Sequence, residues 1–313
     1  MKTILLSLFM VVSLTGAACT RAIGAPNNAS PPTPLPQLTN ISTRALVETG
    51  DNVVIGGFIV QGGASNRVII RAIGPELTQH GVSDALHNPT LELHNARGDL
   101  IASNDNWVTT IIGGIITQNQ VRDIMNSGHA PGNGLESAII ADLPPGNYTA
   151  IVRGVNDTTG VGLVEVYDLN NPGTVPSSIL RNISSRSLVL EGDNVMIGGF
   201  IVQGSGKKRV IVRAIGPELT RYGVRNVLTD PTLELHNGRG AVIASNDNWQ
   251  TTILGGVITR DQVMDIQNSG HAPMQSSESA IIADLPPGRY TAIVQGKNII
   301  VGVALVEVYD LDP

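Results

Sequence analysis

The stretch GDNVVIGGFIVQG at residues 50–62 returns as GDNVMIGGFIVQG at residues 192–204, and this recurrence decides how the chain is organised. Shifting the sequence by 142 positions realigns it with itself without a gap, and about 70% of the aligned positions are identical. Other matched segments are RAIGPELT (71–78 and 213–220), ESAIIADLPPG (136–146 and 278–288) and LVEVYDL (163–169 and 305–311). A unit of this length can bury a core of its own, so the sequence predicts two self-sufficient copies of one domain rather than a solenoid.

The composition favours strands over helices in both copies. Hydrophobic residues make up 42% of the chain but aromatic residues only 3%, so Val, Ile and Leu must fill the cores. These runs are broken by 35 glycines and 18 prolines, a pattern typical of strands joined by turns. The predicted fold class is therefore all-β, with two tandem antiparallel β-sandwich domains of jelly-roll type, each carrying one short helix.

Alternation and turn residues predict the same elements in each unit. In the first unit, strands are expected at 52–61, 67–73, 91–95, 100–103, 137–141, 148–153 and 161–169. Gly56 and Gly57 inside the first of these indicate a bulge or a close approach of backbones. The segment TQNQVRDIMNSG (117–128) predicts the helix, with a capping box and an apolar stripe: Thr117 and Gln120 for the box, Val121, Ile124 and Met125 for the stripe, and Gly128 at the C-cap.

The N-terminus reads as an export signal. Lys2 precedes an apolar run and the small residues of MKTILLSLFMVVSLTGAA, so residues 1–25 are predicted to be a signal peptide. Cys19 follows those small residues directly and is a candidate lipid anchor, the alternative being cleavage after Ala18 or Ala25. The predicted location is secreted or cell-surface.

The remaining boundaries follow from composition and from the repeat. Residues 26–38 form a Pro-rich linker, 39–170 the first sandwich, 171–179 a second linker, and 180–313 the second sandwich. No later run of about 18 apolar residues exists, so no transmembrane segment is expected. The net charge of −6 argues against a nucleic-acid partner.

The second half of each unit resembles a known family. The segments LELHNARGDLIASNDNW, ESAIIADLPPGNYTAIVRG and GVGLVEVYDL are similar to the bacterial pre-peptidase C-terminal type of β-sandwich, which itself resembles collagen-binding modules of secreted proteases. The matching residues are Asn104-Asp105, Leu143 to Tyr148, and Val164 to Tyr167. The resemblance implies a non-catalytic accessory module of exported proteins. The first half of each unit departs from that pattern.

The loop after the predicted hairpin is the strongest candidate site. Asn104, Asp105 and Asn106, joined by Glu136, offer the hard oxygen ligands that Ca²⁺ prefers. The alternative is that these side chains only cap a turn through bonds to the backbone. The second copy repeats the set as Asn246, Asp247, Asn248 and Glu278.

Both tryptophans of the chain follow this loop, as Trp107 and Trp249. Each could be a core plug at the corner, or a surface platform that stacks on the rings of a bound sugar.

Other polar residues are given structural interpretations. Arg71 and Arg213 lie within apolar strands and need a carboxylate partner, for which Asp51 or Glu76 is expected in the first unit. His94 is expected on a solvated strand face and His129 in a loop, because no zinc-ligand spacing is present.

No catalytic signature is found, so the chain is expected not to be an enzyme and to need no cofactor other than the candidate Ca²⁺. The predicted function is a non-catalytic binding or adhesion protein whose partner is a polysaccharide, a matrix protein or an envelope component. Two identical weak sites would add avidity. The alternatives are a secreted glycosidase-type hydrolase using paired carboxylates among Glu92, Glu165 and Asp105, and a purely structural envelope protein.

Overall fold

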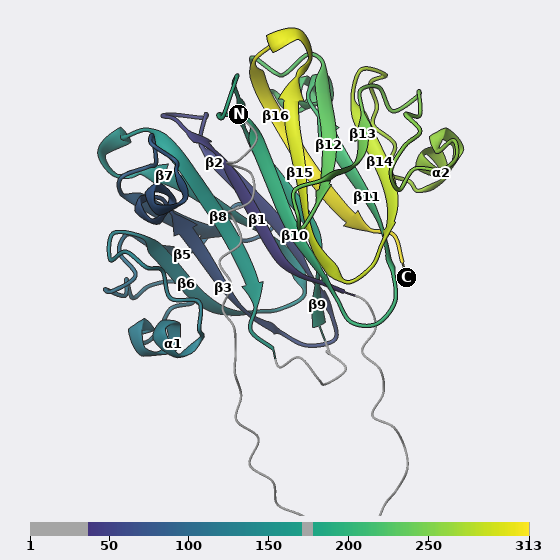
Figure 1. Cartoon of the computed structure of the whole chain (residues 1–313). Coiled ribbons are helices and arrows are strands. Elements are labelled where there is room, and N and C mark those ends of the chain that lie inside the picture. The colour runs from purple at the N-terminus through teal and green to yellow at the C-terminus, as the bar shows by residue number, and fades with distance from the viewer. Residues whose placement is uncertain (1–36, 171–177, 313) are drawn as a thin grey trace, which may run out of the picture.

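The computed structural model describes residues 37–170 and 178–312 and shows an all-β protein with only short helices, as predicted (Figure 1). The predicted signal peptide with Cys19, and almost all of both predicted linkers, lie outside the described residues. Within the described ranges, no helix has both the length and the apolar character needed to cross a membrane.

The two repeats contain the same elements in the same order. Repeat 1 comprises β1 (Gln37–Val47), β2 (Val54–Gly62), β3 (Asn66–Ile73), η2 (Pro75–His80), β4 (Pro89–His94), β5 (Leu100–Asn104), α1 (Val121–Asn126), β6 (Ser137–Leu143), β7 (Gly146–Gly154), η3 (Val155–Asp157) and β8 (Gly160–Asp168). Repeat 2 comprises β9 (Ser178–Val189), β10 (Met196–Gln203), β11 (Lys208–Ile215), η4 (Pro217–Tyr222), β12 (Pro231–Asn237), β13 (Val242–Asn246), α2 (Val263–Asn268), β14 (Ser279–Leu285), β15 (Gly288–Gly296), η5 (Lys297–Ile299) and β16 (Gly302–Asp310).

Each repeat has two antiparallel layers around an aliphatic core. In repeat 1, β5-β4-β7-β2 form one layer and β6-β3-β8 the other. Alternate residues of each strand face inward, which is why Val54, Phe58 and Val60 of β2 are all buried. The core is therefore mainly aliphatic, as the composition predicts, and Phe58 stacks on Tyr148 within it.

The first strand of each repeat joins the two repeats together. β1 pairs with β8 of its own repeat and also with β10 of repeat 2, where Thr43 lies opposite Gly198. β9 correspondingly pairs with β16 of its own repeat and with β2 of repeat 1. One path of bonded strands consequently runs β13-β12-β15-β10-β1-β9-β2-β7-β4-β5 through both repeats (Figure 1).

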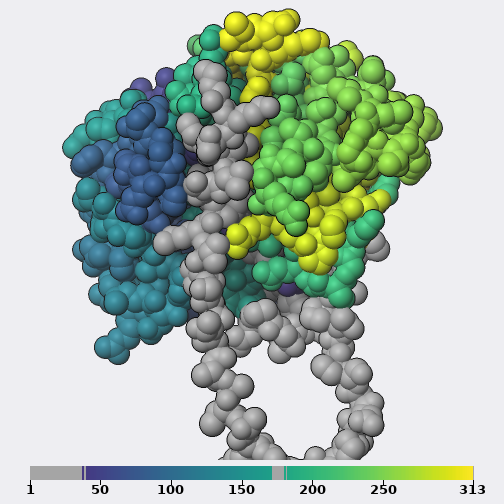
Figure 2. Space-filling model, in the orientation of Figure 1, coloured from purple at the N-terminus to yellow at the C-terminus, as the bar shows by residue number. Residues whose placement is uncertain are grey.

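This exchange corrects the expectation of two self-sufficient sandwiches. The largest buried apolar cluster contains Leu38 and Phe58 of repeat 1 together with Leu180 and Phe200 of repeat 2. Because β1 and β9 each complete a layer of the other repeat, neither half holds all the strands of its own sandwich. Figure 2 shows the halves as neighbouring lobes, one blue to teal and one green to yellow.

The exchange is organised about an approximate twofold axis between β1 and β9. These strands run parallel, with Leu38 beside Leu180 and Leu46 beside Leu188. At the centre the Thr43 hydroxyl donates to the Ser185 hydroxyl at 2.7 Å, and these residues occupy equivalent positions of the repeats. The predicted close approach at the paired glycines is present, since a Cβ on Gly57 would lie 3.2 Å from the Ser184 carbonyl oxygen.

The predicted helix forms, but later and shorter than its sequence signals suggest. α1 begins at Val121 with Gln120 at the N-cap and no side-chain cap, so the predicted capping box is absent. The Gln120 amide instead exchanges two hydrogen bonds with the backbone of Ile140, which fixes α1 against β6. Ile124 is buried, whereas Met125 is 61% exposed, because a helix of this length presents only one residue to the core.

Candidate functional site

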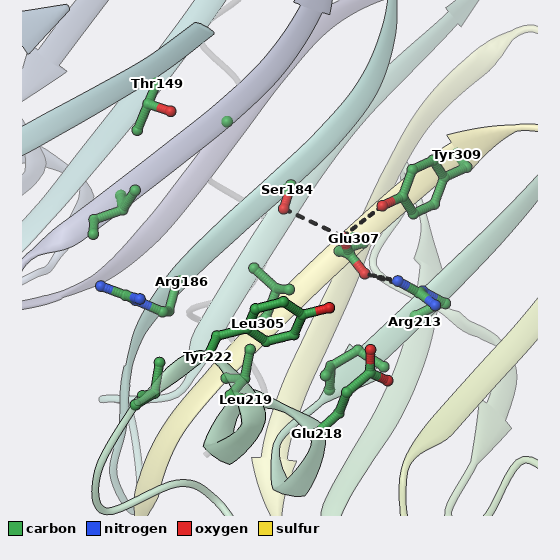
Figure 3. A pocket seen from close by; sticks show the side chains of 14 residues that line it. Thr149, Ser184, Arg186, Arg213, Glu218, Leu219, Tyr222, Leu305, Glu307 and Tyr309 are labelled. Carbon is green, nitrogen blue, oxygen red and sulfur yellow. Dashed lines mark hydrogen bonds and ion pairs between the residues drawn. The ribbon is translucent and has the colours of Figure 1, made fainter. Parts of the chain in front are cut away.

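A groove lies where the two repeats meet, and we call it the seam groove. It combines a cavity of about 410 Å³ with one of about 770 Å³, which share Arg186, Tyr222 and Val224. Strands β2 and β7 of repeat 1 and β9, β11, η4 and β16 of repeat 2 line the first cavity (Figure 3). Its remaining lining residues are Ile55, Gly57, Thr149, Ser184, Arg213, Ile215, Glu218, Leu219, Leu305, Glu307 and Tyr309, and those of the second are Asp51, Asn52, Gly223, Arg225, Asn226 and Val303.

The floor of the seam groove is one face of the sheet that the strand exchange makes continuous. Residues directly opposite each other on neighbouring strands form rows across this face. One row contains Arg213, Glu307, Ser184, Gly57 and Thr149, in strand order β11, β16, β9, β2 and β7. Without the pairing of β9 to β2, this row would end at Ser184 and the groove would lose its repeat 1 side.

A buried ion pair closes one end of the row. Arg213 Nε donates to Glu307 Oε2 at 3.0 Å, and the Tyr309 hydroxyl donates to Glu307 Oε1 at 2.6 Å. Arg213 also donates to the His271 carbonyl oxygen at 2.8 Å. Burial alone would lower the pKa of Arg213, but Glu307, together with Tyr309 and Glu218, outweighs burial and raises it. The hydrogen bonds of this ion pair are therefore supplied from within the protein.

Arg186 lies in the next row across the same face, and its surroundings differ from those of Arg213. It is half-buried opposite Leu305 and Ile55. Among the described residues it has no hydrogen-bond or ion-pair partner. Figure 3 shows its guanidinium directed away from the Arg213–Glu307 pair. A guanidinium carries five donors, so Arg186 presents unused hydrogen-bonding capacity to the groove.

The short helix η4 forms a wall of the seam groove beside this sheet. Pro217 begins this short helix, and Gly216 before it is required because a Cβ there would lie 1.9 Å from the Leu228 carbonyl oxygen. Gly223 ends it in the left-handed conformation, with φ of +78°. These local constraints place Tyr222 on the groove with 71% of its surface exposed.

The corresponding place in repeat 1 is almost closed. The equivalent of the 770 Å³ cavity measures about 40 Å³ and is lined by Arg44, Val82, Asp84 and Asp193, among others. Arg44 is 8% exposed, and its Nε atom is buried without a hydrogen bond. Burial lowers the pKa of Arg44, while the charges of Asp193 and Asp84 oppose that change. The two seams are thus unequal, and the expectation of two identical sites does not extend to them.

Two of the predicted calcium ligands, Asn104 and Asn246, use their side-chain amides to hold turns. Asn104 is buried and donates to the Thr109 carbonyl oxygen at 2.9 Å, while its own oxygen accepts from the Ala138 amide. Asn246 makes the equivalent bonds in repeat 2. In the described chain no three His, Cys, Asp or Glu side chains are grouped so as to hold a metal ion.

Glu136 lies beside this loop through its backbone but points elsewhere. Its carbonyl oxygen accepts from the Trp107 amide, whereas its carboxylate accepts from the amides of Gly74, Glu76 and Asn133 at 2.8 to 3.2 Å. Burial raises the pKa of Glu136 to about 7, with the three N–H bonds opposing the rise. Glu278 repeats the arrangement. The side chain thus orders the backbone around η2.

Asp105 and Asn106 keep free oxygens in repeat 1, since the Oδ1 atom of each is buried without a hydrogen bond. In repeat 2 the ammonium of Lys297 donates to Asp247 Oδ2 at 2.6 Å and lies 3.9 Å from Asp230 Oδ2. The residue equivalent to Lys297 in repeat 1 is Val155. Asp247 Oδ1 is likewise buried without a hydrogen bond among the described residues, so the feature that separates the two loops is the lysine ammonium in repeat 2. Calcium binding remains a prediction.

The tryptophans pack at corners, which is the first of the two alternatives. Trp249 is 6% exposed and packs with Ile211 and Ile266, while Trp107 is partly buried in the equivalent cluster. The two indole nitrogens donate to the carbonyl oxygens of Asn133 and Gln275. A buried ring cannot stack on a sugar, so the predicted platform at Trp249 is not supported.

The other predicted partners differ from those observed. Arg71 pairs with Glu165 rather than with Asp51 or Glu76, because β3 and β8 place the two residues directly opposite each other. Glu92 hydrogen-bonds to His94 instead. The structure therefore does not bring Glu92 and Glu165 together as a pair of acids.

The histidines also have definite environments. His94 is partly buried beside Glu92 and Gly98 rather than fully solvated. His129 lies in a loop, as expected, and stacks on Tyr167 with ring centroids 4.2 Å apart.

Sequence reasoning missed Arg186 and Tyr222. The signal that could have found Tyr222 is divergence between the repeats around η2 and η4, whereas Arg186 matches Arg44 of repeat 1 and carries no such signal. TQHGVSD at 78–84 becomes TRYGVRN at 220–226, so the second loop gains two arginines and loses the one acid of the first loop. This loop borders the seam groove.

The comparisons with known proteins leave the chain without a family. No family model and no curated protein matches it. A DUF4785 family protein from Legionella pneumophila is 9% identical, with 94% of this chain and 89% of that chain covered and a TM-score of 0.22. PNGF-II is 10% identical with a TM-score of 0.22, covering 89% of this chain and 57% of that chain. Likeness this low carries no argument about fold or function.

Proposed function

We propose that this protein is an exported, non-enzymatic binding protein that holds an extracellular polysaccharide in the seam groove. The observation that carries the proposal is the groove itself, which is open, crosses strands of both repeats, and combines an exposed tyrosine with an arginine that has no partner in the described part of the chain. Aromatic faces pack on sugar rings, and guanidinium donors match the oxygens of a glycan.

The arrangement favours binding over catalysis. A glycosidase needs two carboxyl groups flanking the bond to be cleaved. In the groove, Glu307 is held by Arg213 and Tyr309, and Glu218 accepts from the amide of Met274. Both carboxylates are therefore committed to internal contacts. Of the three acids that line the groove in the described chain, only Asp51 is left uncommitted, and a single carboxylate supports holding a chain rather than cleaving it.

Secretion and surface attachment belong to the same proposal, because the N-terminal sequence predicts export. Of the partners considered, a polysaccharide suits the groove better than a flat protein surface, since a linear chain fits an elongated hollow. A matrix or envelope protein partner remains the alternative outcome of the test.

The test is depletion of the full-length protein from solution by a panel of insoluble and gel-embedded polysaccharides, with product analysis for released sugar ends. We expect retention on at least one polysaccharide, no released product, and loss of retention in Tyr222→Ala. His80→Ala is the matched control, since His80 is the equivalent residue of repeat 1 and should leave retention unchanged. Retention on no polysaccharide would overturn the proposal, and product release would show a hydrolase.

A further inference from the structure

We propose that the seam groove selects an acidic polysaccharide, one whose sugars carry carboxylates, and that Arg186 is the residue that binds a carboxylate. This inference rests on the proposed function and names its ligand class. It depends on the geometry around Arg186, on the charge of the loop beside it, and on the contrast with repeat 1.

Arg186 needs an acceptor that the described chain does not supply. Its neighbours in the cross-strand row are Leu305 and Ile55, which are apolar. Asp51 lines the same cavity but makes no hydrogen bond or ion pair with it among the described residues. The planar guanidinium fork matches a carboxylate by two parallel hydrogen bonds, which are stronger than bonds between neutral groups.

The loop that borders the groove has gained positive charge in repeat 2. Relative to repeat 1, Gln79 is replaced by Arg221, Ser83 by Arg225, and Asp84 by Asn226. Each change adds one positive unit, in a protein whose net charge is −6. Arg225 and Asn226 both line the 770 Å³ cavity, so these changes act on the groove directly.

The three acids of the seam groove do not cancel this effect, and Glu307 is already paired with Arg213. Glu218 is buried and directs Oε2 to the Met274 amide at 3.1 Å. Asp51 supplies one negative charge to a cavity to which Arg186 and Arg225 supply two positive charges. In repeat 1 the balance is reversed, since Arg44 faces both Asp84 and Asp193 in a cavity of about 40 Å³. An anion is therefore excluded from that seam by charge and by size.

Exposed Tyr222 supplies the second half of the recognition. It replaces His80 of repeat 1 and lines both cavities. A tyrosine ring offers an apolar face to a sugar ring while its hydroxyl stays in water. One sugar can thus stack on Tyr222 while its carboxylate reaches Arg186.

The experiment is titration calorimetry of the full-length protein with three soluble oligosaccharides of matched length: an oligogalacturonate, a sulfated oligosaccharide and a neutral oligoglucoside. We expect the oligogalacturonate to bind more tightly than the neutral ligand, with an affinity that falls as salt is raised. Arg186→Gln should weaken it roughly ten-fold or more, the usual loss for a hydrogen bond to a charged group.

Two control variants protect the interpretation. Arg44→Gln changes the equivalent arginine in the closed seam and should leave affinity unchanged. The triple variant Tyr222→His, Arg225→Ser and Asn226→Asp gives repeat 2 the repeat 1 residues at three of the four loop positions that differ, and it leaves Arg221, which does not line either cavity, unchanged. These positions border the groove away from the core, so the variant should fold yet bind as weakly as Arg186→Gln.

Three outcomes would overturn the inference. If the neutral oligosaccharide binds as well as the acidic one and Arg186→Gln has no effect, the groove binds glycans but does not select anions, and only the proposed function survives. Preferred binding of the sulfated ligand would assign Arg186 to sulfate rather than carboxylate. If no oligosaccharide binds, the proposed function fails as well.

Discussion

A fragment consisting of repeat 1 alone, residues 37–170, is expected to form a homodimer rather than a folded monomer. In the intact chain β9 lies beside β2, and β10 lies beside β1. The fragment lacks both partners. Its own β1 has a sequence equivalent to β9, so a second copy of the fragment can supply each missing strand through the same exchange.

The size of the effect follows from what β9 buries. Leu180, Ile183 and Val189 are each no more than 1% exposed. Full burial of such side chains contributes about 1.5–3 kcal/mol each, or roughly 5–9 kcal/mol together. Since a domain is stabilised by only about 5–15 kcal/mol in total, a monomeric repeat would retain little or no stability.

The assay is light scattering coupled to size-exclusion chromatography, followed by urea unfolding over about a hundred-fold range of fragment concentration. A dimer whose unfolding midpoint rises with concentration is expected, whereas the midpoint of the full-length chain should stay constant. A fragment that is monomeric at every concentration and unfolds as cooperatively as the intact protein would refute the role assigned to the exchange.

Three further predictions concern stability. Glu136→Gln should lower the free energy of unfolding by about 1–3 kcal/mol in chemical denaturation, because the amide NH₂ that replaces one carboxylate oxygen cannot accept the backbone N–H bond that this oxygen receives; an unchanged midpoint would contradict this. The pKa values of His129 and His271 are lowered, first by burial and then by the nearby arginine charge, so these residues bind more protons in the unfolded chain below pH 6.5. Their contribution to the pH slope of stability is therefore a loss of stability as pH drops through that value, opposite in sign to the contribution of Glu136, whose pKa is raised. Replacing both with Phe keeps the stacking on tyrosine and should remove this contribution from the pH slope in melting curves; a slope equal to that of the parent would refute the assignment. Added Ca²⁺ is expected to raise the melting temperature through the loop of repeat 1, an effect lost in Asp105→Ala and kept in Asp247→Ala, because the Lys297 ammonium bonded to Asp247 Oδ2 repels a cation from the loop of repeat 2; a melting temperature of the parent protein that changes with neither Ca²⁺ nor chelator would contradict calcium binding.

The strands that sequence reasoning could find are those with one buried face. β2 and β4 alternate between buried and half-buried residues, so their periodicity indicates a strand within one or two residues of the observed bounds. β1 carries no such signal, since its Ser42, Thr43 and Arg44 are all buried. Polar residues covered on both sides give no alternation, and the strand was therefore not predicted.

The strand exchange could not be predicted for a related reason. The two strands that could receive β1 are β2 and β10, and they differ by a single residue, Val54 against Met196, over the stretch from Gly50 to Gly62. Local preference and cross-strand pairing are therefore almost the same for either choice. What decides the partner is the geometry of the whole molecule, which no local pattern contains.

The same limit applies to the candidate site. The loop oxygens, the tryptophans and Arg71 could be identified as residues needing partners, but the choice of partner depends on which strands are neighbours. The partner of Arg71 is Glu165, 94 positions away, through β3 and β8. The seam groove exists only where the two repeats meet, and its sole trace in the sequence is the divergence between η2 and η4.

The hydroxyl contact between Thr43 and Ser185 has a consequence for how such a molecule can change. In an assembly of two identical chains, every substitution enters both halves at once, and a residue near the axis always faces its own copy. Covalent fusion of the halves removes that constraint, and here a threonine already faces a serine. Symmetry can then be broken one position at a time, so one interface can stay sealed for cohesion while the other opens to the surroundings.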